Sequence, residues 1–260
     1  MFQLSNIMPS YLITGTGKGI GLGLVNELLK NPENQVLATT RNPSNSEGLQ
    51  ELAKQYPDPN RLIILKLDIS SYENIDEIGK QVEQILPNGL DYLINNAGLS
   101  QQSLVSFDDI DVDIALDELR LNTLSIIRVL RAFKPVLARG KDKKVLTITS
   151  RLGSIEGAPE VASLARIYSI SKAALNMTMR KWIADNYAST GITGVLSHPG
   201  VVATQLGAKV EEWAKLVGTT VAVISVEESA QGLLKNILGD PSKFSSKVQY
   251  FDYDGSSIAW

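Results

Sequence analysis

A glycine-rich segment, residues 14–21, most constrains the fold of this chain because it separates two different structural patterns. It follows an apolar run at residues 11–13 and precedes a helical pattern over residues 22–30. Glycine has no Cβ atom, so the backbone can turn tightly there and approach a ligand closely. A strand, a glycine-rich turn and a helix, in this order, present backbone N–H groups and a helix N-terminus to a pyrophosphate. The segment therefore predicts a dinucleotide site.

Short apolar runs alternate with helical patterns along the rest of the chain. Most runs are continuously apolar, which is typical of parallel strands buried on both faces. Repeated β-α-β units predict one α/β domain over residues 1–260, a doubly wound and mostly seven-stranded parallel sheet with helices on both faces. Strands are predicted at residues 12–13, 36–38, 62–65, 92–94, 145–148, 194–196 and 248–251, and helices at 22–30, 47–56, 72–86, 110–139, 164–189 and 227–238.

Two segments fall outside this alternation. Residues 1–10 are expected to be a frayed extension, in which Met8 is an alternative start to Met1. Residues 200–226 interrupt the alternation between a strand and a helix. A lid over a substrate and a pair of surface helices explain that interruption equally well.

The composition argues against several kinds of site. The 260 residues contain no cysteine, which excludes disulfides, thiolate nucleophiles and cysteine zinc sites. The single histidine, His198, argues against a three-histidine zinc site, so no metal is predicted and His198 is interpreted as a packing or turn residue. A net charge of −3 without a strong basic block argues against nucleic acid as the main partner.

Membrane and export signals are not evident in the sequence. No apolar run approaches the roughly 20 residues that a membrane helix needs. The first ten residues lack the basic region and apolar stretch of a secretory signal. These features predict a cytoplasmic protein with no membrane partner.

Further motifs follow the glycine-rich segment in order. They are Asp68 after the third strand, Asn95-Asn96-Ala97-Gly98 after the fourth, Asn122 within a long helix, Ser150 after the fifth, Tyr168 with Lys172, and Pro199-Gly200 after the sixth. In this order the motifs resemble the short-chain dehydrogenase/reductase family, over essentially the whole chain from Tyr11 to Gly255. The resemblance implies a Rossmann fold and an oxidoreductase that uses a nicotinamide cofactor.

Tyr168 and Lys172 are the candidate proton-transfer pair. Lys172 lies four positions after Tyr168, so a helix places both on one face. A free tyrosine has a pKa of about 10 and is a poor acid at neutral pH. A neighbouring lysine cation is expected to lower that pKa, so that the phenol donates its proton to a carbonyl oxygen while hydride reaches the carbon. By itself this spacing would indicate an ordinary helix, and the surrounding motifs favour the catalytic interpretation.

The resemblance assigns roles to two more residues. Ser150 would hydrogen-bond the substrate carbonyl, and Asn122 would perturb its helix and hold a water that connects Lys172 to solvent. Ser154 lies nearer to the family's usual spacing from Tyr168, but Ser150 is preferred because it ends an apolar strand, where α/β sheets place ligand-facing groups. The longer spacing predicts an enlarged loop, residues 151–167, that shapes the substrate pocket.

The end of the second strand indicates the cofactor. NAD-binding enzymes place an acidic residue there to hold the ribose 2′-OH, but residues 35–46 contain no Asp or Glu. Arg41 can bind a 2′-phosphate bidentately and Lys18 adds a second cation, which predicts NADP(H). Gly17 departs from the pattern, because NADP-binding relatives often carry Ser there. The alternative is that Arg41 is a solvated surface charge.

The predicted cofactor site combines these motifs. By resemblance Asp68 and the Ile69 backbone contact adenine, and Thr204 binds the nicotinamide carboxamide or, alternatively, only caps a helix. The full set of predicted cofactor-binding residues is Gly15, Gly17, Lys18, Gly19, Ile20, Arg41, Asp68, Ile69, Asn95, Ala97, Gly98, Tyr168, Lys172, Pro199, Gly200, Val202 and Thr204.

The predicted function is NADPH-dependent reduction of an apolar or aromatic ketone or aldehyde. The residues Thr40-Arg41-Asn42-Pro43 and the ending at residues 251–255 resemble a branch of small carbonyl reductases and fungal aromatic ketoreductases. The candidate pocket residues are Leu99, Leu152, Ile155, Trp213, Leu216 and Val217. An NADP(H)-binding regulator or sensor and an NAD-dependent alcohol oxidation remain as alternatives. By resemblance the helices at residues 110–139 and 164–189 form the interface of a homodimer or homotetramer.

Overall fold

The computed structural model describes residues 8–260, so the expectation of a frayed segment at residues 1–7 lies outside the described residues. The first strand, β1 (Ser10–Ile13), begins inside the expected extension. Ser10 is held there by Asp91, whose carboxylate accepts hydrogen bonds from the Ser10 N–H at 2.9 Å and from its hydroxyl at 3.0 Å. This tertiary contact extends the strand beyond the apolar run.

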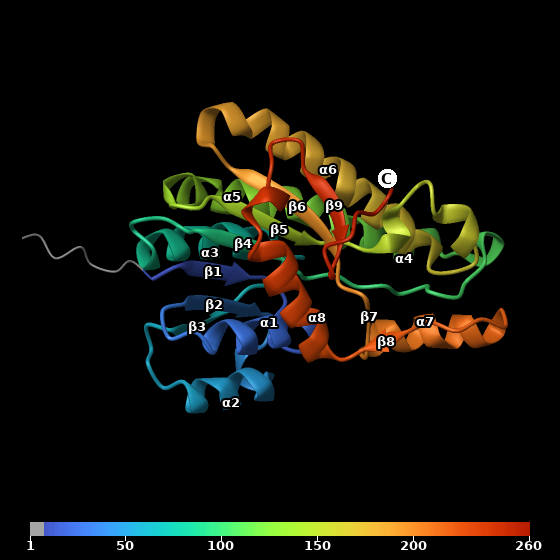
Figure 1. The fold of residues 1–260 in the computed structure, drawn as a ribbon, viewed down its shortest axis with the longest axis horizontal. Helices are drawn as coiled ribbons and strands as arrows, with labels where there is room; N and C mark the ends of the chain where they lie inside the picture. The colour runs from blue at the N-terminus through green and yellow to red at the C-terminus, as the bar shows by residue number, and fades with distance from the viewer. Residues whose placement is uncertain (1–7) are drawn as a thin grey trace, which may run out of the picture.

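Seven parallel strands form the central sheet, in the order β3-β2-β1-β4-β5-β6-β9 (Figure 1). The first strand, β1, lies inside the sheet with β2 and β3 on one side and the later strands on the other, so the strand order reverses between β1 and β4. The carboxyl ends of strands at such a reversal border a crevice that binds ligands in α/β folds. The strands after β1 are β2 (Gln35–Thr40), β3 (Leu62–Lys66), β4 (Tyr92–Asn95), β5 (Lys144–Ile148), β6 (Thr193–His198) and β9 (Gln249–Asp252).

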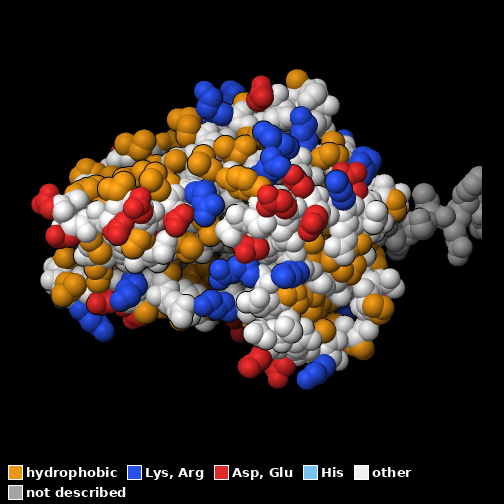
Figure 2. Space-filling view, turned by 180° about the vertical axis from the view of Figure 1, so that it is seen from behind, with side chains coloured by type: hydrophobic (Ala, Val, Ile, Leu, Met, Phe, Trp, Pro, Cys, Tyr) orange, Lys and Arg blue, Asp and Glu red, His pale blue; other side chains and the backbone are white. Residues whose placement is uncertain are grey.

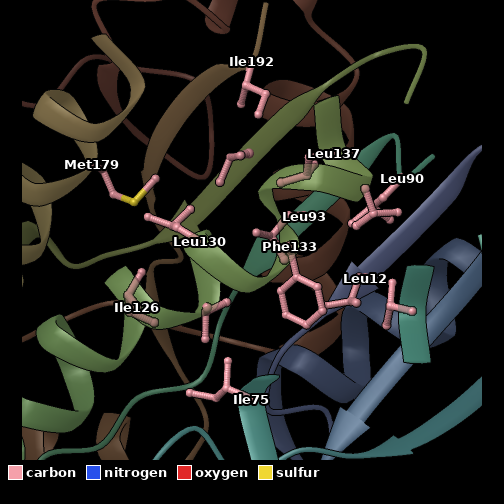
Figure 3. Close-up of a cluster of buried hydrophobic side chains, with 14 of the residues drawn as sticks. Leu12, Ile75, Leu90, Leu93, Ile126, Leu130, Phe133, Leu137, Met179 and Ile192 are labelled. Carbon is pink, nitrogen blue, oxygen red and sulfur yellow. The ribbon is translucent and has the colours of Figure 1, made fainter. Parts of the chain in front are cut away.

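Helices cover both faces of this sheet, which confirms the predicted fold class. On one face lie α3 (Tyr72–Ile85), α5 (Ser125–Arg139) and α6 (Arg166–Thr190), and on the other lie α1 (Gly19–Leu29), α2 (Glu47–Gln55) and α8 (Val226–Gly232). Each face has its own apolar core. Figure 3 shows the first core, in which Phe133 of α5 packs near Leu12 of β1 and Ile75 of α3.

The long helix predicted at residues 110–139 is interrupted in the structure. It consists of α4 (Val112–Leu119), a π-helical turn over Arg120–Leu124, and α5. Asn122 lies within the π-helical turn, so the predicted perturbation of the helix at this residue is confirmed. A π-helical turn inserts an extra residue into the helix and so shifts the backbone. Such turns are frequent at functional sites.

Residues 200–226 do not form the pair of surface helices considered above. They contain one helix, α7 (Gln205–Leu216), between two short parallel strands, β7 (Val201–Val202) and β8 (Val223–Ile224). This unit projects beyond the end of the main sheet (Figure 1). Within the part of the chain that the structure describes, no helix is long and apolar enough to cross a membrane.

Candidate active site

The glycine-rich turn after β1 is held against the turn after β4. Gly15 has φ +73°, and a Cβ atom on it would lie 2.9 Å from the Cα of Ala97, so only glycine fits. The Asn96 side-chain amide donates to the carbonyls of Thr14 at 2.9 Å and Gly15 at 3.0 Å. In return the Thr14 hydroxyl accepts from the N–H groups of Asn96 and Ala97. Sequence reasoning did not assign Asn96 to the site, although it stands inside the quoted motif.

The N-terminus of α1 opens onto this turn. In the described part of the chain no side chain caps α1, and its first turn carries no acidic residue. Backbone N–H groups at an uncapped helix N-terminus are available to an anionic ligand, and the helix dipole favours negative charge there. The glycine turn and this helix end therefore fit a pyrophosphate.

Hydroxyl groups occupy the space beside Gly17. A Cβ atom on Gly17 would come within 2.8 Å of the Thr40 hydroxyl and 3.2 Å of the Ser46 hydroxyl, and these two hydroxyls lie 3.1 Å apart. A serine side chain at residue 17 would collide with them. The serine that NADP-binding relatives often carry at this position is absent here, and the hydroxyls of Thr40 and Ser46 lie at the same place.

Arg41 and Asp68 lie close enough to interact at the ends of β2 and β3. Burial alone would raise the pKa of Asp68, but hydrogen bonds from Ser70 and the positive charges of Arg41 and Lys66 hold it below its usual range. Ile69 is buried in the core, so only its backbone is available to a ligand. The Lys18 ammonium donates to the side-chain oxygen of Gln205 at 2.7 Å, which links the glycine turn to α7.

The four predicted catalytic residues form a chain of neighbours that begins beside Gly98. Tyr168 and Lys172 lie on α6, Ser150 lies two residues after the end of β5, and Asn122 lies in the π-helical turn. A Cβ atom on Gly98 would be 3.3 Å from Asn122 Oδ1 and 3.5 Å from Lys172 Nζ. The Lys172 ammonium also lies 5.4 Å from the centre of the Tyr168 ring and donates to the Ile148 carbonyl at 3.1 Å.

The electrostatics of the pair differ from the sequence-based expectation. Burial raises the pKa of the Tyr168 phenol above its ordinary value, the Glu118 carboxylate raises it further, and a hydrogen bond with Ser150 opposes both. The predicted lowering of the Tyr168 pKa is therefore wrong for this structure, because burial outweighs the one interaction that lowers it, the hydrogen bond with Ser150. Burial lowers the pKa of Lys172 itself to about 8, against the opposing charge of Glu118.

The hydroxyls of the two candidate serines, Ser150 and Ser154, have different hydrogen-bond partners. The Ser150 hydroxyl accepts from the Leu152 N–H at 3.2 Å and is also close enough to Tyr168 to act on its pKa. The Ser154 hydroxyl accepts from the Gly157 N–H at 3.1 Å. Ser154 therefore stabilises the loop after β5, and Ser150 is the serine beside the phenol.

The loop after β6 lies over the glycine turn. Gly200 has φ +85°, and the Pro199 carbonyl accepts from the Ser229 hydroxyl at 2.6 Å. Val202 belongs to β7, and the Thr204 hydroxyl accepts from the Gly207 N–H at 3.3 Å. Thr204 thus caps α7, as in the alternative interpretation of this residue. Its methyl group would lie 3.5 Å from a Cβ atom on Gly19, so it also faces the glycine turn.

Asn95, which was predicted to bind the cofactor, and the single histidine, His198, contact neighbouring strands of the sheet. The Asn95 side chain is buried and donates to the Thr147 hydroxyl at 3.2 Å, so it ties β4 to β5. His198 ends β6 beside Asp252, and desolvation lowers the pKa of its imidazole to about 4 despite that carboxylate. The ring is therefore neutral at physiological pH. Within residues 8–260 no group of three His, Cys, Asp or Glu side chains is arranged to hold a metal.

An apolar cluster surrounds Tyr168, and it contains only some of the predicted pocket residues. Leu152 and Trp213 pack there, but Ile155, Leu216 and Val217 are 75%, 72% and 49% exposed. These three were assigned by position in a loop, and position does not fix which side of a loop a residue faces. The residues that sequence reasoning missed are Leu104, Val161, Leu164, Ala165, Leu206 and Val210. The spacing of Leu206, Val210 and Trp213, typical of one helix face, was the available signal.

Comparisons with known proteins agree with this architecture. The family model described as short chain dehydrogenase matches residues 10–215. An uncharacterized oxidoreductase of Schizosaccharomyces pombe is 30% identical over 254 residues, covering 95% of this chain and 96% of that protein. The short chain dehydrogenase gsfK of Penicillium aethiopicum is 31% identical, covering 97% of this chain and 100% of its own.

Solved structures show the same fold over nearly the whole chain. The NADPH-bound carbonyl reductase from chicken fatty liver has a TM-score of 0.82 at 28% identity and covers 98% of this chain and 99% of its own. The carbonyl reductase Sniffer of D. melanogaster has a TM-score of 0.83 at 28% identity, with 97% and 100% coverage. A carbonyl reductase from Pseudomonas aeruginosa PAO1 in complex with NADP has a TM-score of 0.77 at 29% identity, with 97% and 100% coverage.

Proposed function

Since this chain belongs to the short-chain dehydrogenase/reductase family and is an oxidoreductase of that family, we propose that it reduces an apolar ketone or aldehyde with NADPH. The observation that carries the proposal is the convergence of Asn122 and Lys172 on Gly98, with Tyr168 and Ser150 beside them. A neighbouring phenol, cation and hydroxyl are the groups that a carbonyl oxygen needs as it gains charge and a proton.

NADP(H) fits the residues at the glycine turn. Gly15 leaves room for a close approach, the uncapped N-terminus of α1 suits a pyrophosphate, and Arg41 and Lys18 supply cations for a 2′-phosphate. Two of the similar structures are described as carbonyl reductases with NADPH or NADP bound. When bound, the reduced nicotinamide supplies the hydride.

The protein's own residues supply the proton. In the proposed reaction the Tyr168 hydroxyl donates a proton to the carbonyl oxygen, and the Lys172 ammonium stabilises the phenolate that remains. The Ser150 hydroxyl donates a hydrogen bond to the same oxygen. The Asn122 side chain bonds to both the N–H and the carbonyl of Leu99, at 2.9 and 2.7 Å, and so holds the segment after Gly98 in place.

Consumption of NADPH tests this function. Turnover of apolar ketones or aldehydes, measured through the loss of NADPH absorbance, is the expected result. Tight NADPH binding with no turnover of any carbonyl compound would favour an NADP(H)-binding regulator instead. Oxidation of alcohols with NAD, at rates above carbonyl reduction with NADPH, would contradict the proposed direction and cofactor.

Trp213 is proposed to bind the apolar part of the substrate. Its indole N–H donates to the Ser163 hydroxyl at 2.9 Å, which connects α7 to the loop before α6. Replacing Trp213 with Ala removes a large apolar surface, and burial of such a side chain contributes about 1.5–3 kcal/mol. KM for a bulky aromatic ketone is expected to rise about tenfold or more, with a smaller change in kcat. In the matched control Leu216→Ala, on the exposed side of α7, KM should not change.

A symmetric oligomer is proposed to form through the exposed side of α4, α5 and α6. Leu116, Leu124, Ile127, Ile170 and Met177 are exposed there. Figure 2 shows hydrophobic side chains gathered along the upper part of the face seen from behind. Exposed apolar patches of this kind mark interfaces, and soluble oligomers are mostly symmetric.

Introducing a charge tests that interface. Met177→Glu is expected to lower the particle mass measured by light scattering toward that of a monomer, because a buried unpaired carboxylate is costly. Leu216→Glu adds the same charge on α7 and should leave the mass unchanged. Equal masses for both variants and the wild type would place the interface elsewhere.

A further inference from the structure

Glu118 of α4 is a buried carboxylate that the proposed reaction leaves unexplained. It is fully buried, whereas its neighbours Asp117 and Arg120 are exposed and pair with each other at 3.3 Å. One carboxylate oxygen, Oε2, accepts from the Gln101 N–H at 2.8 Å. The other, Oε1, is buried without a hydrogen-bond partner among residues 8–260. Since buried charges are normally paired or hydrogen-bonded, an orphaned carboxylate oxygen calls for a reason.

The position of Glu118 connects it to the catalytic residues. It lies four residues before Asn122, and both side chains hold the segment that follows Gly98. Asn122 binds both backbone groups of Leu99, and Glu118 binds the N–H of Gln101. The same segment begins at the glycine that Lys172 Nζ approaches. Glu118 therefore faces the buried interior around α6, not the solvent.

The charge of Glu118 acts on two titratable groups, Lys172 and Tyr168, and both come from α6. Burial raises the pKa of Glu118, while the Gln101 N–H and the charge of Lys172 lower it. In return the Glu118 charge raises the pKa of Lys172, which burial brings down to about 8, and also raises the pKa of Tyr168. Beside Glu118, Asp117 of α4 and Arg120 of the π-helical turn pair with each other at the surface. Among residues 8–260, Glu118 is thus the one negative charge acting on Lys172.

We propose that Glu118 is a positioning residue that keeps Lys172 protonated inside the protein, so that an ammonium faces Tyr168 when the phenol gives up its proton. The proposal rests on the proposed function, because a charged Lys172 matters only if Tyr168 becomes a phenolate. Charge balances in each turnover. Tyr168 loses a proton to the carbonyl oxygen and regains one from solvent, while Glu118 stays a carboxylate.

The pH dependence of reduction distinguishes this role from a merely structural one. The measurement is kcat/KM for NADPH-dependent carbonyl reduction across the alkaline range, in the wild type and in Glu118→Gln. Removing the negative charge favours deprotonation of both Lys172 and Tyr168, so the alkaline limb is expected to move to lower pH. Reduction at about pH 9 should fall several-fold more than reduction at about pH 6.

Two further variants control this experiment. Asp117→Asn removes a charge from the same helix at an exposed site and should leave the pH profile unchanged. Glu118→Asp keeps the charge, so its alkaline limb should stay near that of the wild type even if total activity falls. A Glu118→Gln profile that superimposes on the wild type, or that is lower by one factor at every pH, would overturn the proposal.

A titration that does not depend on turnover tests the role of Glu118 separately from the proposed carbonyl reduction. The ¹³Cε signal of Lys172, assigned by its loss in Lys172→Arg, reports the protonation of the amine directly. Its midpoint is expected at lower pH in Glu118→Gln than in the wild type. If the wild type turns over no carbonyl, the proposed function fails and this midpoint alone decides: a lower value supports the role of Glu118, and an unchanged value overturns it.

Discussion

A Tyr168→Phe variant is expected to reduce carbonyl substrates about 10²–10⁴ times more slowly than the wild type, the usual size of a lost general acid. The ring keeps its place in the apolar cluster with Leu164 and Ala165, so the pocket should survive. Only the hydroxyl that donates the proton is removed. The measurement is kcat at saturating NADPH, together with the dissociation constant for NADPH, which should change little.

Tyr187→Phe is the matched control for this variant. Tyr187 lies on the same helix, α6, but its side chain is exposed near the helix end. The same loss of a hydroxyl there should leave kcat unchanged. A Tyr168→Phe enzyme as fast as the wild type would show that another group supplies the proton, and the assignment of the catalytic site would fail.

An Arg41→Asp variant is expected to bind NADPH about 10–100 times more weakly. Hydrogen bonds to charged groups contribute about 1.5–3 kcal/mol, and each 1.4 kcal/mol is a tenfold change in affinity. The new carboxylate would also repel a 2′-phosphate, whereas it can accept a hydrogen bond from a ribose 2′-OH. The dissociation constant for NADH should therefore stay the same or fall. The quantity to measure is the ratio of the dissociation constants for NADPH and NADH.

Two variants make this result specific. Arg41→Met removes the cation without adding a carboxylate, so it should weaken NADPH binding without improving NADH binding. Arg131→Asp makes the same charge reversal at an exposed residue of α5 and should alter neither. An unchanged NADPH-to-NADH preference in Arg41→Asp would mean that Arg41 is a solvated surface charge and that the 2′-phosphate binds elsewhere.

The fold was predictable because its signals are local and repeated. Continuous apolar runs, such as Leu12-Ile13 and residues 145–148, indicate parallel strands that are buried on both faces. The disturbed helix at Asn122 followed from the family resemblance, and the structure shows a π-helical turn there. The start of β1 at Ser10 was not predictable, because it depends on Asp91, which is 81 residues away along the chain.

The surroundings of the candidate site were harder to predict than its residues. Glu118 stands in an ordinary polar stretch, Asp117-Glu118-Leu119-Arg120, and nothing local distinguishes the buried carboxylate from the exposed one beside it. Reasoning from the Tyr168–Lys172 spacing considered one charge and no burial, so it gave the wrong direction for the tyrosine pKa. Burial is a property of the folded chain, and it decides which of several possible charges acts on a given group.

Transfer of deuterium from the reduced cofactor to a ketone tests the central claim most directly. The wild-type protein would be incubated with an aromatic ketone and with NADPH in which both hydrogens at nicotinamide C4 are deuterium, and the product examined by mass spectrometry. An alcohol that carries one deuterium, formed by the wild type and absent with Tyr168→Phe, is the predicted result. NADPH that binds but yields no deuterated alcohol from any ketone or aldehyde would contradict the proposed carbonyl reduction.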